Sequence, residues 1–313
     1  MTVIDLHNLK ECDPPHCTVL CLGNFDGVHK GHRALIQETV KLKNQLSSRY
    51  PDIKSGAWFF ERAPLEVISG STVPMLSDLD RKLRIFSSLG LDFAFICSFE
   101  DIGGLSPEAF VADILKKDCG CIFAVCGYNF RFGKNAAGSP DTLNDLMEGN
   151  SLTVNEISYN GKAVSSSLIR NYIAEGCIEE ANALLQRNYS FSAEVIYGKQ
   201  LGRTLGIPTI NQLLPKGLAA PQNGIYISYA VINGKRYKSV TNFGCRPSVN
   251  DGSFINCETH IIDFNGDLYG QVVEIEFIKI IRREKKFDSV DALKEQILND
   301  ILEAKEYFKS KEA

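Results

Sequence analysis

The sequence predicts two domains: an α/β domain with a parallel sheet over residues 1–185, and a small antiparallel β-barrel with a C-terminal helix over residues 186–313. Three observations support this. The length of 313 residues exceeds what a single hydrophobic core usually serves. In the first half, apolar strands alternate with helical patterns. In the second half, strands of alternating polarity joined by tight turns replace this pattern.

Four short apolar runs in the first half predict strands, at residues 18–22, 57–60, 93–97 and 122–126. Between them, residues 31–46 have helical spacing, as do Leu79, Leu83, Phe86 and Leu89. Another helix is expected to open at 106–108, where a serine cap precedes a proline and an acid. Continuous apolar strands separated by helices are typical of a parallel sheet covered on both faces. Such sheets bind ligands beyond the carboxyl ends of their strands.

The pattern changes near residues 186–188. Residues 225–232 alternate in polarity, Asn233 and Gly234 supply a hairpin turn, and residues 237–241 return. A second hairpin is expected between 254–264 and 268–281, around Asn265 and Gly266. One helical face at the end is formed by Val290, Leu293, Ile297 and Ile301. Antiparallel strands with a terminal helix indicate a small barrel.

Composition excludes several protein classes. The 34 basic and 38 acidic residues give a net charge of −4, which disfavours a sequence-independent nucleic-acid binder. No run of about 18 apolar residues predicts a membrane span, and the N-terminus has no secretory signal pattern. We therefore expect a cytoplasmic protein with small-molecule partners. The ten cysteines contain no C-x-x-C pair, so reduced thiols are expected rather than zinc ligands.

The first motif, residues 23–32, joins the first apolar strand to the first helix. Free backbone N–H groups and the positive end of a helix suit a phosphate at such a turn. His29 and His32 can donate hydrogen bonds to phosphoryl oxygens as charge develops. A polar turn with a capping histidine explains one of the two histidines but not the whole string.

This string, G-N-F-D-G-V-H-K-G-H, resembles the H-x-G-H signature of nucleotidyltransferases. In its full form it is similar to the adenylyltransferase half of bacterial bifunctional riboflavin kinase/FAD synthetases. The resemblance implies a Rossmann-like fold and a nucleotide-binding role for the residues of the turn. These residues are Gly23, Asn24, Phe25, Asp26 and Gly31, beside the catalytic His29 and His32.

Two further segments match that family in order. Residues 127–134 follow the fourth strand, and the resemblance implies that Asn129 and Arg131 lie in a loop lining the flavin and nucleotide pocket. Residues 164–170 are similar to the motif S-S-T-x-I-R, which implies that Ser165, Ser166 and Arg170 hold the triphosphate. The chain departs from the family at Ser167, at Leu168 in place of a basic residue, and at Ala63 in place of a histidine.

The second motif, residues 198–211, contains three glycines and two basic residues. If Pro208 keeps the chain extended, Thr209 and Asn211 point to one side, and their oxygens are hard ligands that suit Mg²⁺. The segment resembles the flavokinase motif ending in P-T-x-N. The resemblance implies that the cofactor-binding residues here are Gly198, Lys199, Gly202, Arg203, Thr204, Gly206, Pro208, Thr209 and Asn211.

Glu258 and His260 are two residues apart on a predicted strand and therefore share a face. The flavokinase resemblance gives Glu258 the role of general base, which suits a carboxylate beside an attacking hydroxyl. It also implies that Arg282 flanks the flavin. The alternative interpretation of Glu258 is an ordinary exposed acidic residue. The alternative for Arg282 is that it belongs to a solvated run of charged residues.

The resemblance therefore implies a bifunctional, Mg²⁺-dependent enzyme. The barrel is expected to phosphorylate riboflavin with ATP to give FMN, and the α/β domain to transfer AMP from ATP to FMN, giving FAD and pyrophosphate. One alternative keeps only the kinase active, because Leu168 and Ala63 weaken adenylyl transfer. A second is a non-catalytic flavin sensor that controls RNA or a protein partner, which the acidic balance and Glu258 disfavour.

Overall fold

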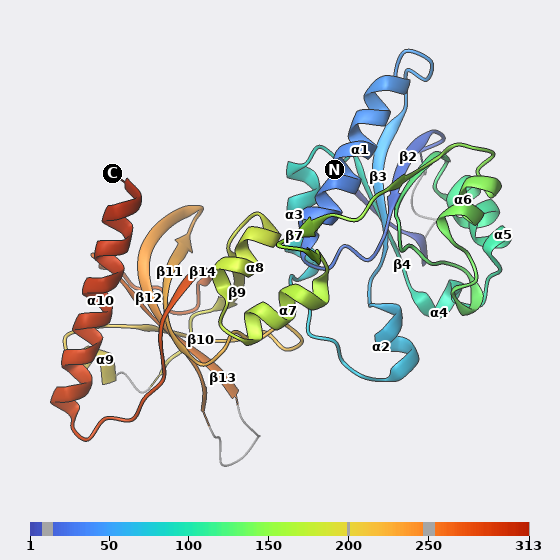
Figure 1. Cartoon of the computed structure of the whole chain (residues 1–313). Coiled ribbons are helices and arrows are strands. Elements are labelled where there is room, and N and C mark those ends of the chain that lie inside the picture. Colours follow the sequence, from blue (N-terminus) through green and yellow to red (C-terminus); the bar gives the residue numbers. More distant parts are fainter. Residues whose placement is uncertain (8–14, 199–200, 247–253, 313) are drawn as a thin grey trace. The chain divides into compact units, whose positions relative to one another are not determined.

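The chain folds into two compact units, seen in a computed structural model that describes residues 1–7, 15–198, 201–246 and 254–312 (Figure 1). The first unit comprises Met1–Val73 and Ser77–Ser166, and the second comprises Pro74–Leu76 and Ser167–Ala313. The expected boundary at residues 185 and 186 lies inside the second unit. How the two activities divide along the chain stays a prediction.

A parallel sheet of six strands forms the first unit, in the order β1-β4-β3-β2-β5-β6. Its strands are β1 (Thr2–Asp5), β2 (Thr18–Leu22), β3 (Lys54–Phe60), β4 (Phe93–Cys97), β5 (Cys121–Gly127) and β6 (Ser151–Val154). The four predicted strands are confirmed as β2 to β5. Sequence reasoning missed β1 and β6, because these edge strands are short and partly exposed and so carry no continuous apolar run.

Helices cover both faces of this sheet. The unit contains α1 (Lys30–Leu46), α2 (Pro64–Ser69), α3 (Leu79–Ser88), α4 (Phe99–Ile102), α5 (Pro107–Ala109), α6 (Pro140–Leu146), the short helices η2 (Asp26–Val28) and η4 (Lys134–Ala136), and the π-helix η3 (Phe110–Asp118). Leu35 of α1 and Phe86 of α3 pack with Phe59 on one face. Val111 of η3 and Leu143 of α6 pack on the other. A small hairpin, β7 (Ser158–Tyr159) and β8 (Lys162–Ala163), completes the unit.

An antiparallel sheet of six strands forms the second unit, in the order β10-β13-β12-β11-β14-β9. The strands are β9 (Tyr189–Glu194), β10 (Ile210–Leu213), β11 (Gly224–Ile232), β12 (Lys235–Arg246), β13 (Phe254–Ile261) and β14 (Val272–Arg283). The sheet closes toward a barrel, since the N–H of Ile196, just after β9, donates to the carbonyl of Asn211 in β10 over 2.8 Å. The expected turn at Asn233 and Gly234 joins β11 to β12 with φ values of 50° and 78°.

The second expected hairpin is wrong. β13 pairs with β10 and β12, whereas β14 pairs with β11 and β9. A two-residue hairpin turn of the kind Asn-Gly favours needs left-handed backbone at both residues, but in this connection Asp263 and Gly270 have positive φ, and Asn265 and Gly266 do not. The loop is long enough to carry the chain across the barrel instead.

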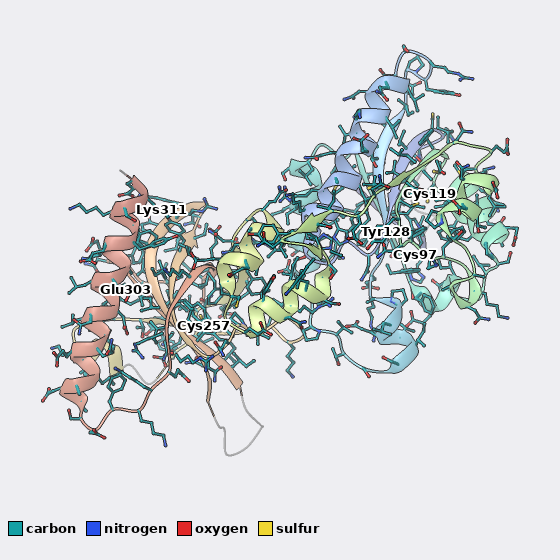
Figure 2. The ribbon with its side chains drawn as sticks, viewed as in Figure 1. Cys97, Cys119, Tyr128, Cys257, Glu303 and Lys311 are labelled. Carbon is teal, nitrogen blue, oxygen red and sulfur yellow. The ribbon has the colours of Figure 1, made fainter. Side chains whose placement is uncertain are left out.

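Four helices complete the second unit: α7, which begins at its edge (Ser166–Ala174), α8 (Ile178–Leu185), α9 (Leu201–Thr204) and α10 (Val290–Glu312). Ile301, Ala304 and Phe308 of α10 pack against the outer face of the barrel. Of the face predicted for this helix, Val290 is 56% exposed, so the apolar contact begins further along. Glu303 and Lys311 in Figure 2 mark the course of α10.

Most described cysteines are buried thiols of the two cores. Figure 2 labels Cys97 and Cys119 in the first unit and Cys257 in the barrel, all free and buried. Burial raises the pKa of the Cys257 thiol to about 12, so it behaves as a small apolar side chain. Among the described residues, no helix has both the length and the apolar composition that a membrane crossing requires.

Candidate active sites

A cavity of about 330 Å³ lies at the carboxyl ends of three strands in the first unit. Leu22 ends β2, Gly127 ends β5 and Val154 ends β6, and all three line it. The strand order runs outward from β2 through β3 on one side and from β5 to β6 on the other. Open parallel sheets bind ligands where the order reverses in this way. The cavity is therefore where the architecture itself favours a ligand.

The turn after β2 holds its backbone in unusual conformations. Phe25, Gly27 and Val28 have φ values of 52°, 75° and 41°. Left-handed backbone is rare for a β-branched residue such as Val28, and each such residue costs of order 1–3 kcal/mol. Phe25 and Val28 are fully buried, and the Phe25 ring meets Phe86 edge to face at 5.3 Å. Packing therefore holds the strained turn in place.

The two histidines of this turn stack on each other, with ring centroids 3.6 Å apart. His29 caps helix α1: its Nδ1 accepts the backbone N–H of His32 over 3.3 Å. In its neutral form His29 therefore carries its proton on Nε2. Burial first, then the positive charges of His29 and Lys82, hold the pKa of His32 well below 6.5. His32 is therefore a neutral donor at pH 7.

Lys82 of helix α3 lies beneath the turn. Its side chain is buried, and Nζ donates to the carbonyl of Asn24 over 3.1 Å. The ammonium also lies 4.7 Å from the ring centre of Phe59. Burial lowers the pKa of Lys82 to about 8, and the Asp26 carboxylate opposes that shift. A buried cation is costly unless paired, so this one fixes both the turn and its local charge.

Two other segments complete the first cavity. Ser166 Oγ donates to the carbonyl of Asp26 over 3.0 Å, which ties the serine cluster to the histidine turn although 140 residues separate them. Tyr128, labelled in Figure 2, follows β5 and is 45% exposed at the cavity edge. Beyond it, Phe130 and Phe132 stack at 5.6 Å.

Most site residues predicted for the first domain come together here. The cavity is lined by Gly23, Asn24, His29, Gly31, His32, Asn129, Ser165 and Ser166. Phe25 and Asp26 are buried and are not among the lining residues. Arg131 donates from Nη1 to the carbonyl of Phe130 over 2.9 Å. Arg170 belongs to the second unit, where its Nε donates to the carbonyl of Pro74 over 2.7 Å.

One row of directly paired residues crosses five strands of the barrel. The strand register aligns Asn211 in β10, Glu258 in β13, Asn242 in β12, Ile225 in β11 and Arg282 in β14. Directly paired residues in a sheet point to the same face. Except for Asn211, the members of this row line a cavity of about 620 Å³. The register alone therefore gathers residues from distant parts of the chain.

The Glu258 carboxylate, second in this row, has polar neighbours. Asn256 Nδ2 donates to Oε1 of Glu258 over 3.0 Å, which orients the carboxylate along its own strand. The side-chain oxygens of Asn211 and Asn242 are buried and have no hydrogen-bond partner among the described residues. A Cβ on Gly198 would stand 2.5 Å from the Asn211 amide, so only glycine fits there.

An ion pair fixes the far end of the row. Arg282 binds Asp300 of α10 through two parallel bonds, from Nε over 2.9 Å and from Nη2 over 2.7 Å. The Asp300 side chain is only 3% exposed, and Gln296 Nε2 donates to its Oδ1 over 2.9 Å. The Arg282 guanidinium also lies 5.7 Å from the ring centre of Phe287. Bidentate pairing of this kind holds the guanidinium in one orientation.

A second cavity of the barrel, of about 510 Å³, adjoins the end of the motif at residues 198–211. It is lined by Pro208, Thr209 and Thr259 and by the loop from Phe264 to Tyr269. Thr209 lines both barrel cavities, so the two meet at this residue. Tyr269 stacks on Tyr197 with ring centres 3.9 Å apart, which provides a flat aromatic surface at its edge.

Five of the predicted barrel residues line these two cavities. Gly202, Thr209, Glu258 and Arg282 line the larger one, and Pro208 lines the smaller. Gly206 has a φ of 78°, and Thr204 is exposed. Lys199 and the Arg203 side chain lie outside the described residues. His260 also lines the larger cavity, and its Nδ1 lies 2.8 Å from the carbonyl of Pro208.

Sequence reasoning missed Lys82, Asn242 and Asp300 as contributors to the sites. Lys82 lies three residues after Leu79 and four before Phe86, on the apolar face of its helix. Asp300 similarly precedes Ile301 on the buried face of α10. A charged residue at a position where the helical pattern expects an apolar one is the sequence signal that could have identified Lys82 and Asp300. Asn242 carries no such signal, because only pairing with β13 brings it beside Glu258.

Two family models match the chain. The FAD synthetase model matches residues 12–168, and the riboflavin kinase model matches residues 185–308. The chain is 34% identical over 309 residues to the bifunctional riboflavin kinase/FMN adenylyltransferase of Escherichia coli (strain K12), covering 97% of this chain and 96% of that protein. It is 31% identical over 298 residues to the protein of the same name from Bacillus subtilis (strain 168), covering 93% and 92%.

A solved structure has the same fold. It is titled as a macrolide-efflux protein from Streptococcus pneumoniae and is 26% identical in sequence. The alignment covers 97% of this chain and 99% of that one, with a TM-score of 0.88.

Proposed function

Since the chain belongs to the family of bifunctional riboflavin kinase/FMN adenylyltransferases, we propose how its residues divide the two reactions. The enzyme phosphorylates riboflavin with ATP to give FMN, and it transfers AMP from ATP to FMN to give FAD and pyrophosphate. A kinase with a degenerate first domain is not favoured, because the FAD synthetase model matches residues 12–168. A cytoplasmic location stays a prediction.

Glu258 is the general base of the kinase reaction. The observation that carries this assignment is its position in the row across the barrel, between Asn211 and Asn242 and lining the 620 Å³ cavity. The nucleophile is the neutral terminal hydroxyl of riboflavin, which must lose its proton as it attacks the γ-phosphate. An oriented carboxylate accepts that proton, and general-base catalysis is typically worth about 10²- to 10⁴-fold in rate.

The two barrel cavities hold different substrates. Transfer requires the hydroxyl and the γ-phosphate to meet, and Thr209 is the residue that both cavities share. Glu258 lines only the larger cavity, which Phe287, Ile297 and other apolar side chains also line. We therefore assign riboflavin to the larger cavity and ATP to the smaller, with the reacting atoms near Thr209.

Thr209 and Asn211 supply the oxygen ligands for Mg²⁺. The buried Asn211 oxygen has no partner among the residues described, so the donor set fits a hard cation. Bound there, the ion would neutralise charge on the phosphates. Gly198 leaves room for the Asn211 amide, and Thr209 lines both cavities.

Adenylyl transfer belongs to the first unit. The FMN phosphate is already ionised near neutral pH, so this reaction needs no strong base. It needs positive charge and hydrogen-bond donors around the α-phosphate and the leaving pyrophosphate. His29, His32 and the N-terminus of α1 supply them at the cavity, and Ser165 and Ser166 add hydroxyl donors. That Arg170 holds the triphosphate stays a prediction from the motif at residues 164–170.

Complementary variants test this division. Glu258→Gln should lower FMN formation from riboflavin about 10²-fold or more and leave FAD formation from supplied FMN intact. The double change of His29→Ala with His32→Ala should do the reverse. The products are separated by chromatography after incubation with ATP and Mg²⁺. If Glu258→Gln removed both products while remaining folded, the assignment of one reaction to each unit would be wrong.

A further inference from the structure

Two side-chain oxygens flank Glu258, one on each neighbouring strand. Asn211 pairs directly with Glu258 from β10, and Asn242 pairs directly with it from β12. Both oxygens are buried, and neither accepts a hydrogen bond from the part of the chain that the structure describes. A buried acceptor without a donor costs free energy, so each of these oxygens is suited to a donor or cation that arrives with a ligand.

The two amides serve different ligands. Neighbouring strands are about 4.8 Å apart, so Asn211 and Asn242, two strands apart, are separated by roughly 10 Å along the row. That is too far for one ion to bind both. Asn242 lines the larger cavity, beside Ile225 and on the Arg282 side of the carboxylate. Asn211 lies two residues after Thr209, on the side of the smaller cavity.

The proton count then limits what Asn242 can bind. The terminal hydroxyl of riboflavin has one proton, and Glu258 takes it during the reaction. The Asn242 oxygen is an acceptor as well and cannot share that proton. The neighbouring hydroxyl of the ribityl chain, at the 4′ carbon, is the next donor along the row.

We propose that Asn242 positions riboflavin for the kinase reaction, its side-chain oxygen accepting a hydrogen bond from the 4′ hydroxyl of the ribityl chain. This inference rests on the proposed kinase function of the barrel. The bond holds the adjacent terminal hydroxyl against Glu258, since the two hydroxyls stand on neighbouring carbons and the two acceptors on neighbouring strands. Asn242 thus contributes to orientation and takes no proton.

Binding measurements with three flavins test the proposal. Quenching of flavin fluorescence gives the dissociation constants of riboflavin, of 4′-deoxyriboflavin and of lumiflavin, which has no ribityl chain. In the full-length protein, Asn242→Ala should weaken riboflavin binding about 3- to 10-fold, as expected for loss of one hydrogen bond. It should leave the binding of the other two flavins unchanged. Asn299→Ala, on an exposed part of α10, is the matched control and should change none of the three.

Equal weakening of all three flavins, or no weakening of any, would overturn the proposal. If Asn242→Ala unfolds the barrel, Asn242→Val replaces it, because valine suits a strand and also lacks an acceptor. Failure of the proposed function gives a separate result: the unchanged enzyme would then form no FMN from riboflavin and ATP.

Discussion

The two sites of this enzyme are built in different ways. In the first unit, one strained turn of consecutive residues supplies the histidines, and the N-terminus of the helix that follows lies beside them. In the barrel, Asn211, Glu258 and Arg282 come from three separate strands and lie in one row through register. A turn is specified locally, whereas a row across a sheet depends on every strand between its ends.

This difference suits the two proposed nucleophiles. A phosphate that is already ionised needs surrounding donors, which a helix N-terminus and two histidines provide. A neutral hydroxyl needs a base at a fixed distance, which a carboxylate on a rigid sheet provides. Substitutions at three residues can break or sharpen the contrast.

Asp300→Ala should have the largest effect, confined to the barrel. It leaves the Arg282 guanidinium half-buried without its bidentate partner, and breaking a buried ion pair costs about 3–5 kcal/mol of stability. The riboflavin KM should rise with it. Trp58 is the single tryptophan and lies in the first unit, so the urea unfolding curve measured by its fluorescence should stay unchanged. The unfolding curve measured by circular dichroism should show the lower stability of the barrel.

Glu295→Ala is the control, because it removes an exposed carboxylate from the same helix. Its effect on unfolding should stay within about 0.5 kcal/mol. Equal effects of the two substitutions would mean that the ion pair does not hold the end of the row.

Lys82 should give the first unit a pH dependence that the barrel lacks. Its pKa of about 8 means that the ammonium is lost as the pH rises through 8. Above pH 8, the rate of FAD formation from FMN should then fall about tenfold per pH unit. The rate of FMN formation should show no such decline from this group. Lys82→Arg keeps the positive charge at high pH and should remove this decline. An unchanged decline in that variant would mean that another group causes it.

The same residue should change stability in the opposite direction. Between pH 8 and 10.5 the unfolded chain binds the proton that the folded chain has released, so the free energy of unfolding rises with pH. The rise amounts to about 3 kcal/mol at most over this window. Lys82→Met should lack it, as measured by Trp58 fluorescence during urea unfolding at each pH.

Ser166→Ala should have the smallest effect. It removes the hydrogen bond from Oγ to the Asp26 carbonyl, worth about 1 kcal/mol. The KM for ATP in FAD formation should rise about fivefold, with FMN formation unchanged. Ser88→Ala removes a comparable bond, to the Ile85 carbonyl, outside the site and should alter neither activity. A shift in FMN formation would show that the two sites are not separable.

The sequence by itself determined the features encoded in neighbouring residues. The apolar runs of β2 to β5 and the turn from Gly23 to His32 depend on local composition and spacing, and the structure contains them as expected. Edge strands β1 and β6 were missed, because partial exposure removes the apolar signal.

Only the tertiary structure decided what lies beside what. It separated β13 from β14 despite the Asn-Gly pair between them, and it brought Asn242 next to Glu258. It also buried Lys82 beneath the histidine turn and paired Asp300 with Arg282. Strand order and helix docking are set by the sum of many distant contacts, so no single stretch of sequence records them.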